Sequence, residues 1–114
     1  MTPGEALPGA RRLGSSAEYR RILEQGERRR LRHIDVIWMN NTAGQPRMGL
    51  IVPKFQSTAV ARNRLRRRLR EIWRRDLQPG HPAWDVIIRA KRDAYGASFA
   101  LLRAELAEWR AGAA

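Results

Sequence analysis

Arginine side chains are concentrated in one short segment of this chain. Residues 59–77 read AVARNRLRRRLREIWRRDL and carry eight arginines against two acids, Glu71 and Asp76. A guanidinium group stays charged at neutral pH, pairs bidentately with phosphate oxygens and stacks on nucleobases. A merely solvated basic face would more often contain interspersed acids that offset the repulsion. We therefore expect this segment to bind a polyanion.

Few residues have side chains of the kinds that perform catalysis or hold metals. The chain contains no cysteine, and its two histidines, His33 and His81, stand far apart. Glu105 and Glu108 share a helical face, but an exposed pair at this spacing is more often a solvated surface than a catalytic pair. No glycine-rich phosphate loop, Ser/His/Asp set or HExxH pattern occurs. We predict no catalytic residue and no metal site formed by the protein.

Lys54 is an isolated basic residue just before the arginine-rich segment. If that segment is a helix, its first backbone N–H groups favour a phosphate at this place. An ordinary surface lysine is the alternative interpretation. The neighbouring arginines favour the phosphate contact.

The overall charge agrees with an anionic partner. The 114 residues carry a formal net charge of +12 and give a pI near 11.7, which is typical of proteins that bind nucleic acid or an anionic membrane surface. This length is sufficient for one domain with a modest core. No apolar run of about 18 residues and no secretory signal pattern occurs. We expect a cytoplasmic protein without a membrane span, and the lack of cysteine agrees with a reducing compartment.

The arginine-rich segment has the pattern of an amphipathic helix. On a helix its apolar residues fall within one arc of roughly 120°; these are Ala61, Leu65, Leu69, Ile72 and Trp73. On a strand the same residues would be mixed with arginines. The pattern predicts a helix over residues 59–77 whose apolar side, including Trp73, packs on the core.

Helix signals also occur near both ends of the chain. Ser15 and Glu18 have capping-box spacing, and Gly26 is a stop signal, so a short helix is predicted between them. Ser98 can cap a last helix, in which apolar residues recur at about 3.6-residue spacing. Residues 1–14 are rich in glycine and proline and are predicted to be flexible. Residues 111–114 are predicted to form a tail.

Three segments have the composition of strands: residues 34–39 (IDVIWM), 47–52 (RMGLIV) and 84–90 (WDVIIRA). The turn-forming residues 40–46 predict a hairpin between the first two. The apolar centre of the third predicts a central place in the sheet. One more short strand could lie around residues 30–33. The order αββαβα predicts a single α+β domain over residues 15–110, with helices packed on one small mixed sheet.

Two adjoining segments resemble the signature of the bacterial ribonuclease P protein subunit. Residues 47–54 read RMGLIVPK and residues 59–71 read AVARNRLRRRLRE; the family has a strand leading to a lysine-bearing turn, then A-V-x-R-N-R-x-K-R-x-x-R-E. The likeness extends from Arg11 and Arg12 to the third strand and last helix, roughly residues 11–110. The sequence departs from the family pattern at Pro53, where serine is usual, at Phe55, where lysine is usual, and at Ser57, where glycine is usual.

The resemblance implies a ribosomal-protein-like α+β fold with a left-handed crossover into the arginine-rich helix. It also implies that the partner RNA is the catalyst and binds most of the Mg²⁺, while the protein promotes 5′ maturation of tRNA as a subunit of the holoenzyme. The expected partners are ribonuclease P RNA and precursor tRNA, without an obligate protein partner. The residues expected at the RNA are Lys54, Arg62, Asn63, Arg64, Arg66, Arg67, Arg68 and Arg70.

A single-stranded 5′ leader requires an aromatic or apolar surface beside basic residues. Tyr19, together with Trp38 or Ile37, could provide this surface, and the basic residue Lys91 at the end of the third strand is expected nearby. For Tyr19 and Trp38, packing within the core is the alternative interpretation. The resemblance implies a cleft between the first helix, the sheet and the arginine-rich helix for this leader.

Two other functions remain open at the level of sequence. A ribosomal or ribosome-assembly protein would explain the basic composition equally well, but not the spacing of the RNR and RE residues. A DNA-binding protein is a further alternative. However, a face made almost entirely of arginine offers few asparagine or glutamine side chains for reading adenine.

Overall fold

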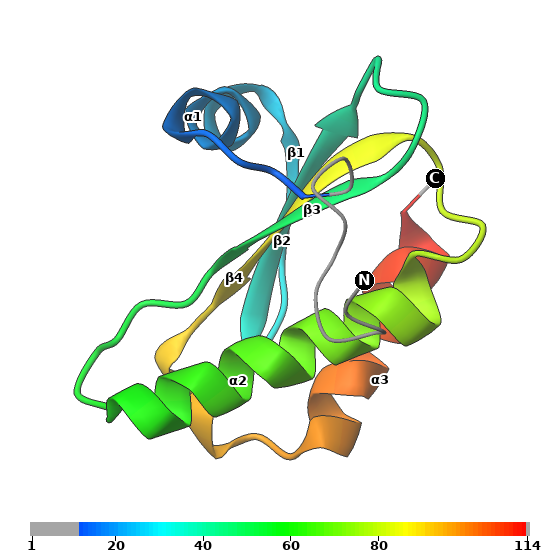
Figure 1. Cartoon of the computed structure of the whole chain (residues 1–114). Coiled ribbons are helices and arrows are strands. Elements are labelled where there is room, and N and C mark those ends of the chain that lie inside the picture. Colours follow the sequence, from blue (N-terminus) through cyan, green and yellow to red (C-terminus); the bar gives the residue numbers. More distant parts are fainter. Residues whose placement is uncertain (1–11, 114) are drawn as a thin grey trace, which may run out of the picture.

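The chain folds into one four-stranded sheet with helices on both faces (Figure 1). The computed structural model describes residues 12–113. The strand order is β1-β2-β4-β3, in which β1 and β2 are antiparallel, β2 and β4 are antiparallel, and β3 and β4 are parallel. This architecture confirms the predicted small α+β domain with a mixed sheet. In chain order the elements are α1 (Ser16–Gln25), β1 (Glu27–Arg30), β2 (Ile34–Asn40), β3 (Arg47–Ile51), α2 (Ala59–Ile72), η2 (Trp73–Leu77), β4 (Trp84–Ala90), η3 (Arg92–Gly96) and α3 (Phe99–Gly112).

The side chains of the central strands alternate between two apolar cores. On β2, Ile37 packs under α1 together with Ile22 and Ile87. The neighbouring residues Val36 and Trp38 belong to the larger core, which α2 and α3 cover from the other face. This alternation follows from the two-residue period of a strand. As a result, α1 lies on one face of the sheet and α2 and α3 lie on the other.

The predicted hairpin between residues 34–39 and 47–52 is wrong. The turn after β2 does reverse the chain, but β4 lies between β2 and β3 and pairs with both. Three consecutive residues of β4, Val86, Ile87 and Ile88, are fully buried, and only a central strand covered on both faces can bury such a run. The predicted central place of this strand is therefore confirmed. The left-handedness of the β3–α2–β4 crossover stays a prediction.

The first and last helices begin at their predicted capping residues, and α2 begins at the predicted residue 59. The Ser15 side chain accepts a hydrogen bond from the Glu18 N–H, and the Glu18 carboxylate accepts from the Ser15 N–H, which completes the capping box. Thr58 caps α2, and Ser98 caps α3. The α-helical part of α2 ends at Ile72, and the π-helical turn η2 carries the helix on to the predicted end at residue 77.

Several short features differ from the sequence-based expectation. The extra strand, β1, covers Glu27–Arg30 rather than residues 30–33, and the 3-10 helix η3 was not predicted. Residues 12–14 of the expected flexible segment are held in place, because the Leu13 N–H donates to the Met48 carbonyl and the Leu13 side chain is buried. Residues 1–11 lie outside the described residues. At the other end, α3 continues to Gly112. Among the described residues, no helix is long and apolar enough to cross a membrane.

Candidate nucleic-acid interface

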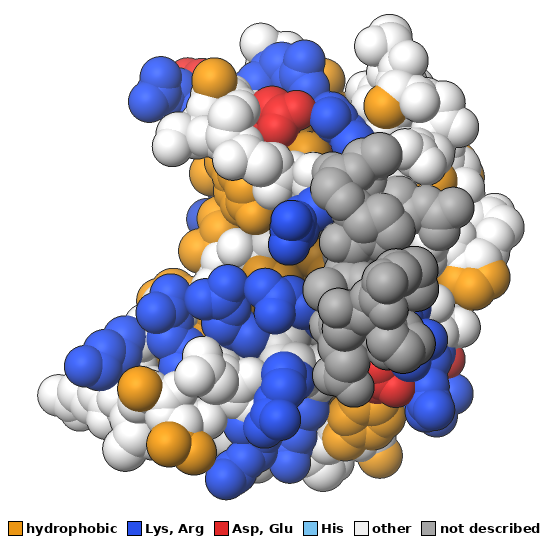
Figure 2. Space-filling view, in the orientation of Figure 1, with side chains coloured by type: hydrophobic (Ala, Val, Ile, Leu, Met, Phe, Trp, Pro, Cys, Tyr) orange, Lys and Arg blue, Asp and Glu red, His pale blue; other side chains and the backbone are white. Residues whose placement is uncertain are grey.

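The first part of α2 carries arginines that have no acidic partner in the described part of the chain. Within residues 12–113, none of the following six forms an ion pair: Arg62, Arg64, Arg66, Arg67, Arg68 and Arg70. Farther along the helix, Arg74 and Arg75 both pair with Glu71. Figure 2 shows Lys and Arg side chains gathered along α2. The basic surface is therefore open to an external anion in the first part of α2 and internally neutralised in the last part.

A cleft of about 220 Å³ lies between α1, the edge strand β3 and α2. Tyr19 of α1 faces Arg66 and Arg70 of α2 across it, and Arg12 and Gly49 also line it. Figure 2 shows this side of the molecule hollowed between α1 and α2, with apolar surface in its depth. The cleft thus combines an aromatic ring with three guanidinium groups.

The position of the Tyr19 ring depends on Gly49. The Tyr19 hydroxyl accepts a hydrogen bond from the Leu50 N–H at 3.2 Å. A Cβ atom at Gly49 would lie 2.4 Å from that hydroxyl oxygen and 2.6 Å from the ring carbon that bears it. Glycine is therefore required on β3 for the ring to lie against the strand.

The three arginines that line the cleft carry like charges at close range. Burial lowers the pKa of Arg70 below its ordinary value, and the neighbouring charges of Arg66 and Arg12 lower it further. An arginine stays protonated in this situation, so the Arg70 charge is held partly out of water and beside two like charges. A bound phosphate would relieve this repulsion. An aromatic ring beside basic residues is the arrangement that single-stranded nucleic acid requires.

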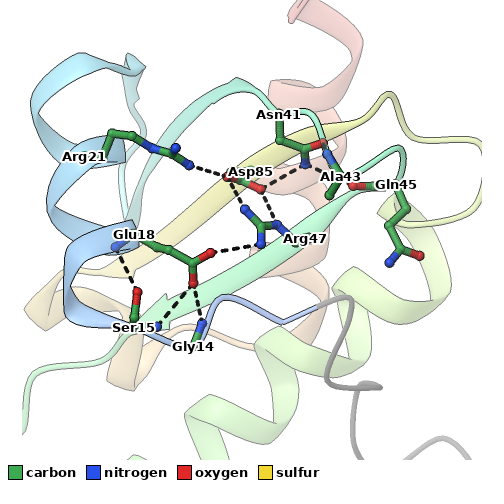
Figure 3. Close-up of polar contacts among 9 residues, drawn as sticks. All are labelled: Gly14, Ser15, Glu18, Arg21, Asn41, Ala43, Gln45, Arg47 and Asp85. Carbon is green, nitrogen blue, oxygen red and sulfur yellow. Dashed lines mark hydrogen bonds and ion pairs between the residues drawn. The ribbon is translucent and has the colours of Figure 1, made fainter.

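A buried ion-pair network connects α1, β3 and β4 (Figure 3). The carboxylate of Asp85, on β4, is completely buried. Arg47 of β3 donates two hydrogen bonds to it, each 2.8 Å long. Arg21 of α1 donates another at 3.2 Å, and Asn41 donates one at 2.9 Å. The pairing with Asp85 raises the pKa of Arg47 above its ordinary value.

Glu18 extends this network to the beginning of α1. Its carboxylate accepts a hydrogen bond from Arg47 at 2.9 Å and one from the Gly14 N–H at 3.0 Å. The Gly14 hydrogen bond is the main reason that the pKa of Glu18 lies below its ordinary value. Because Tyr19 is the next residue, the network fixes the aromatic side of the cleft.

Several residues predicted at the RNA are fully available at the surface. Asn63, Arg64 and Arg67 are exposed on the outer side of α2, and Asn63 makes no hydrogen bond within the described residues. Lys54 is exposed in the turn before α2. Two others are partly engaged within the protein. The Arg62 Nε donates to the Val52 carbonyl at 2.7 Å, and Arg68 donates to the Ala97 carbonyl at 3.4 Å.

Of the four residues predicted at the leader, Tyr19 alone lines the cleft. Ile37 is completely buried under α1. Trp38 points to the other face of the sheet, where its ring contacts Trp84 and Trp109. In this structure the strand alternation buries both residues, so neither lines the cleft. Lys91 follows the far end of β4, where its ammonium group lies 3.3 Å from a carboxylate oxygen of Asp35.

Arg12 and Gly49 line the cleft but were not predicted there from the sequence. A glycine inside a strand is a signal for close approach of another group, but it does not indicate which group approaches. Arg12 reaches the cleft through a parallel bridge to Met48, a long-range contact without a local signature. In the turn before α2, the residue with positive φ is Phe55 (φ 51°) and not Ser57.

Comparison with known proteins shows which family the chain belongs to. The family model of ribonuclease P matches residues 7–113. The chain is 39% identical to the ribonuclease P protein component of Vibrio vulnificus (strain YJ016) over 84 residues, 73% of this chain and 70% of the relative. It is 33% identical to that of Mycobacterium bovis over 100 residues, 88% and 86% of the two chains.

Among solved structures, the chain is similar to a Staphylococcus aureus RNase P protein mutant with defective mRNA degradation activity. The TM-score is 0.81 at 27% identity, with 87% of this chain and 84% of that chain covered. The family match spans the sheet, α1 and α2. The chain therefore belongs to the family of ribonuclease P protein components, subunits of the ribonuclease P endoribonuclease holoenzyme.

Proposed function

We propose that this protein binds the catalytic RNA of ribonuclease P through α2 and holds the 5′ leader of precursor tRNA in the cleft beside Tyr19. The observation that carries the proposal is the set of unneutralised arginines, which begins on the outer side of α2 and ends inside the cleft at Arg66 and Arg70. One continuous basic surface can thus contact two RNA strands.

The two sides of α2 suit different RNA structures. The outer side, with Asn63 and Arg67, forms a shallow groove also lined by Arg66 and Arg70, and arginine forks on such a surface pair with backbone phosphates of folded RNA. The cleft adds the Tyr19 ring, on which an unpaired base can stack. The leader is single-stranded, so it fits the cleft, and the catalytic RNA fits the outer side.

The chemistry of cleavage belongs to the RNA in this proposal. The dense positive charge around Arg70 repels a divalent cation, so Mg²⁺ is held mainly by RNA. The protein lowers the repulsion between the catalytic RNA and the substrate, and less Mg²⁺ is then needed to bring the two together. We place this activity in the cytoplasm, where tRNA precursors are processed.

Reconstitution tests the proposal. The purified protein is combined with a bacterial ribonuclease P RNA and a precursor tRNA, and cleavage is measured as Mg²⁺ is lowered. We expect no cleavage by the protein alone, a lower Mg²⁺ requirement with protein present, and tighter binding of the precursor than of mature tRNA, which lacks a leader. The proposal fails if the protein changes neither the Mg²⁺ requirement nor the preference for the leader.

A further inference from the structure

The turn before α2 holds an aromatic residue in an unfavourable backbone conformation. Phe55 has φ 51°, and the Ser57 N–H donates to the Lys54 carbonyl at 3.0 Å across the turn. A bulky side chain at positive φ is an outlier that costs conformational energy. Burial in the core does not compensate for this cost, because the Phe55 side chain remains 39% exposed.

Two residues of η3 hold the Phe55 ring in place. Tyr95 meets it edge to face, with ring centroids 6.2 Å apart and an interplanar angle of 87°. The Tyr95 hydroxyl donates to the Pro53 carbonyl at 2.6 Å, which ties η3 to the turn. The guanidinium carbon of Arg92 lies 4.9 Å from the Phe55 ring centroid. We call Phe55, Arg92 and Tyr95 the Phe55 platform.

The surroundings of the Phe55 platform are basic. Arg92 is exposed and forms no ion pair within the described residues, although Asp93 is the next residue. Lys54, adjacent to the ring in sequence, is also exposed and unpaired within the same residues. An exposed ring beside a guanidinium plane and free cations is complementary to a nucleobase and its phosphates.

The Phe55 platform lies on a different side of α2 from the Tyr19 cleft. The cleft is lined by Arg66 and Arg70, whereas η3 meets α2 on the side of Arg68, which donates to the Ala97 carbonyl just after η3. If the leader occupies the cleft, a base that reaches the platform belongs to the other RNA.

We propose that the Phe55 platform stacks an unpaired nucleobase of the catalytic RNA and so adds a non-electrostatic contact at the beginning of α2. This inference rests on the proposed function, because it assumes that α2 binds that RNA. The stacked base lies on the exposed surface of Phe55 and Arg92, and Lys54 contacts its phosphate. The strained turn keeps the ring at the surface instead of letting it collapse into the core.

Substitution of Phe55 separates stacking from folding. Phe55→Gly relieves the positive φ but loses the ring contacts with Tyr95 and Arg92, so its melting temperature should stay close to that of the original protein. Affinity for the catalytic RNA should fall about 5- to 150-fold, the range for loss of one base–aromatic stack. The slope of log K against log salt should not change, because no phosphate contact is lost. Phe55→Trp should bind within about threefold of the original protein, since any aromatic face can stack.

Fluorescence gives a measurement that does not depend on the glycine variant. The native tryptophans Trp38, Trp73, Trp84 and Trp109 are each at most 8% exposed, so the added signal of Phe55→Trp comes from the surface. We expect the catalytic RNA to quench this added signal and a leader oligonucleotide to leave it unchanged. Unchanged affinity of Phe55→Gly, absence of quenching, or quenching by the leader alone would each overturn the inference.

The same experiments distinguish this inference from the proposed function. If Phe55→Gly binds normally while Arg67→Ala weakens binding and flattens the salt slope, the platform is refuted and α2 remains the interface. If the original protein does not bind the catalytic RNA at all, both proposals fall.

Discussion

Removing the Asp85 carboxylate should destabilise the fold more than any single surface change. The side chain is completely buried and accepts hydrogen bonds from Arg47, Arg21 and Asn41. In Asp85→Ala, the guanidinium of Arg47 stays largely buried, at 20% side-chain exposure, and keeps only Glu18 as an anionic partner. Breaking a buried ion pair from one side costs about 3–5 kcal/mol. The whole free energy of unfolding of a small domain is about 5–15 kcal/mol, so this single change would remove a large part of it.

Urea unfolding followed by circular dichroism measures the loss in free energy of unfolding, and thermal unfolding measures the change in melting temperature. At about 4–8 °C per kcal/mol for a domain of this size, the melting temperature should fall by roughly 12–40 °C. Arg21→Ala is the matched control, because its side chain is 47% exposed and makes one hydrogen bond to the same carboxylate. Arg21→Ala should lower the free energy of unfolding by no more than about 1 kcal/mol.

A second substitution tests the cause of the loss. If the unpaired charge of Arg47 is responsible, the double variant Asp85→Ala/Arg47→Met should be more stable than Asp85→Ala alone. Two results would show that the unpaired Arg47 charge is not the cause: a free energy of unfolding of Asp85→Ala within about 1 kcal/mol of the original protein, or a double variant that loses the sum of both single effects.

Three further predictions concern the cleft, the basic helix and the interior. Gly49→Ala should displace Tyr19 from β3 and reduce the preference for precursor over mature tRNA. Tyr19→Phe, which loses one hydrogen bond, should keep this preference. Equal leader preference in both variants would contradict the cleft geometry. Arg67→Ala should flatten the slope of log K against log salt by roughly 0.7–0.9. Arg75→Ala should change this slope little, because Arg75 is neutralised within the protein. A larger change of slope in Arg75→Ala than in Arg67→Ala would place the RNA elsewhere. Burial lowers the pKa of His81, so the unfolded chain binds the proton first and stability should fall as pH drops below about 6.5. His81→Phe should lose that pH dependence in urea unfolding between pH 7.5 and 5.5, and an identical dependence in both proteins would assign it to other groups.

Local patterns in the sequence determined the helices of this protein. The Ser15–Glu18 capping box and the Thr58 and Ser98 caps act within one turn of chain, so they are visible without tertiary information. The apolar arc of α2 follows the helical period, and Leu65, Leu69 and Trp73 are buried as that period requires. The charge of α2 was equally readable, because clustering of arginine is a property of composition.

The pairing of the strands depended on the tertiary structure. Residues 40–46 indicate that the chain turns, but they do not indicate whether the strands on either side become neighbours. β4 takes the place between them because its apolar residues on both faces must be covered. β1 consists of Glu27–Arg30, with no apolar residue, and pairs with β2 along its whole length. No periodicity in its side chains could have located it.

The division between interface and core was likewise decided by the fold. Tyr19 and Trp38 are both aromatic residues next to basic segments, and the sequence does not separate them. The strand alternation turns Trp38 toward Trp84 and Trp109, whereas Gly49 allows Tyr19 to lie against β3 beside Arg66. The sequence by itself thus determined that α2 is amphipathic and basic, since both properties are local. The cleft depended on tertiary structure, because its walls come from α1, β3 and α2, which are distant in the chain.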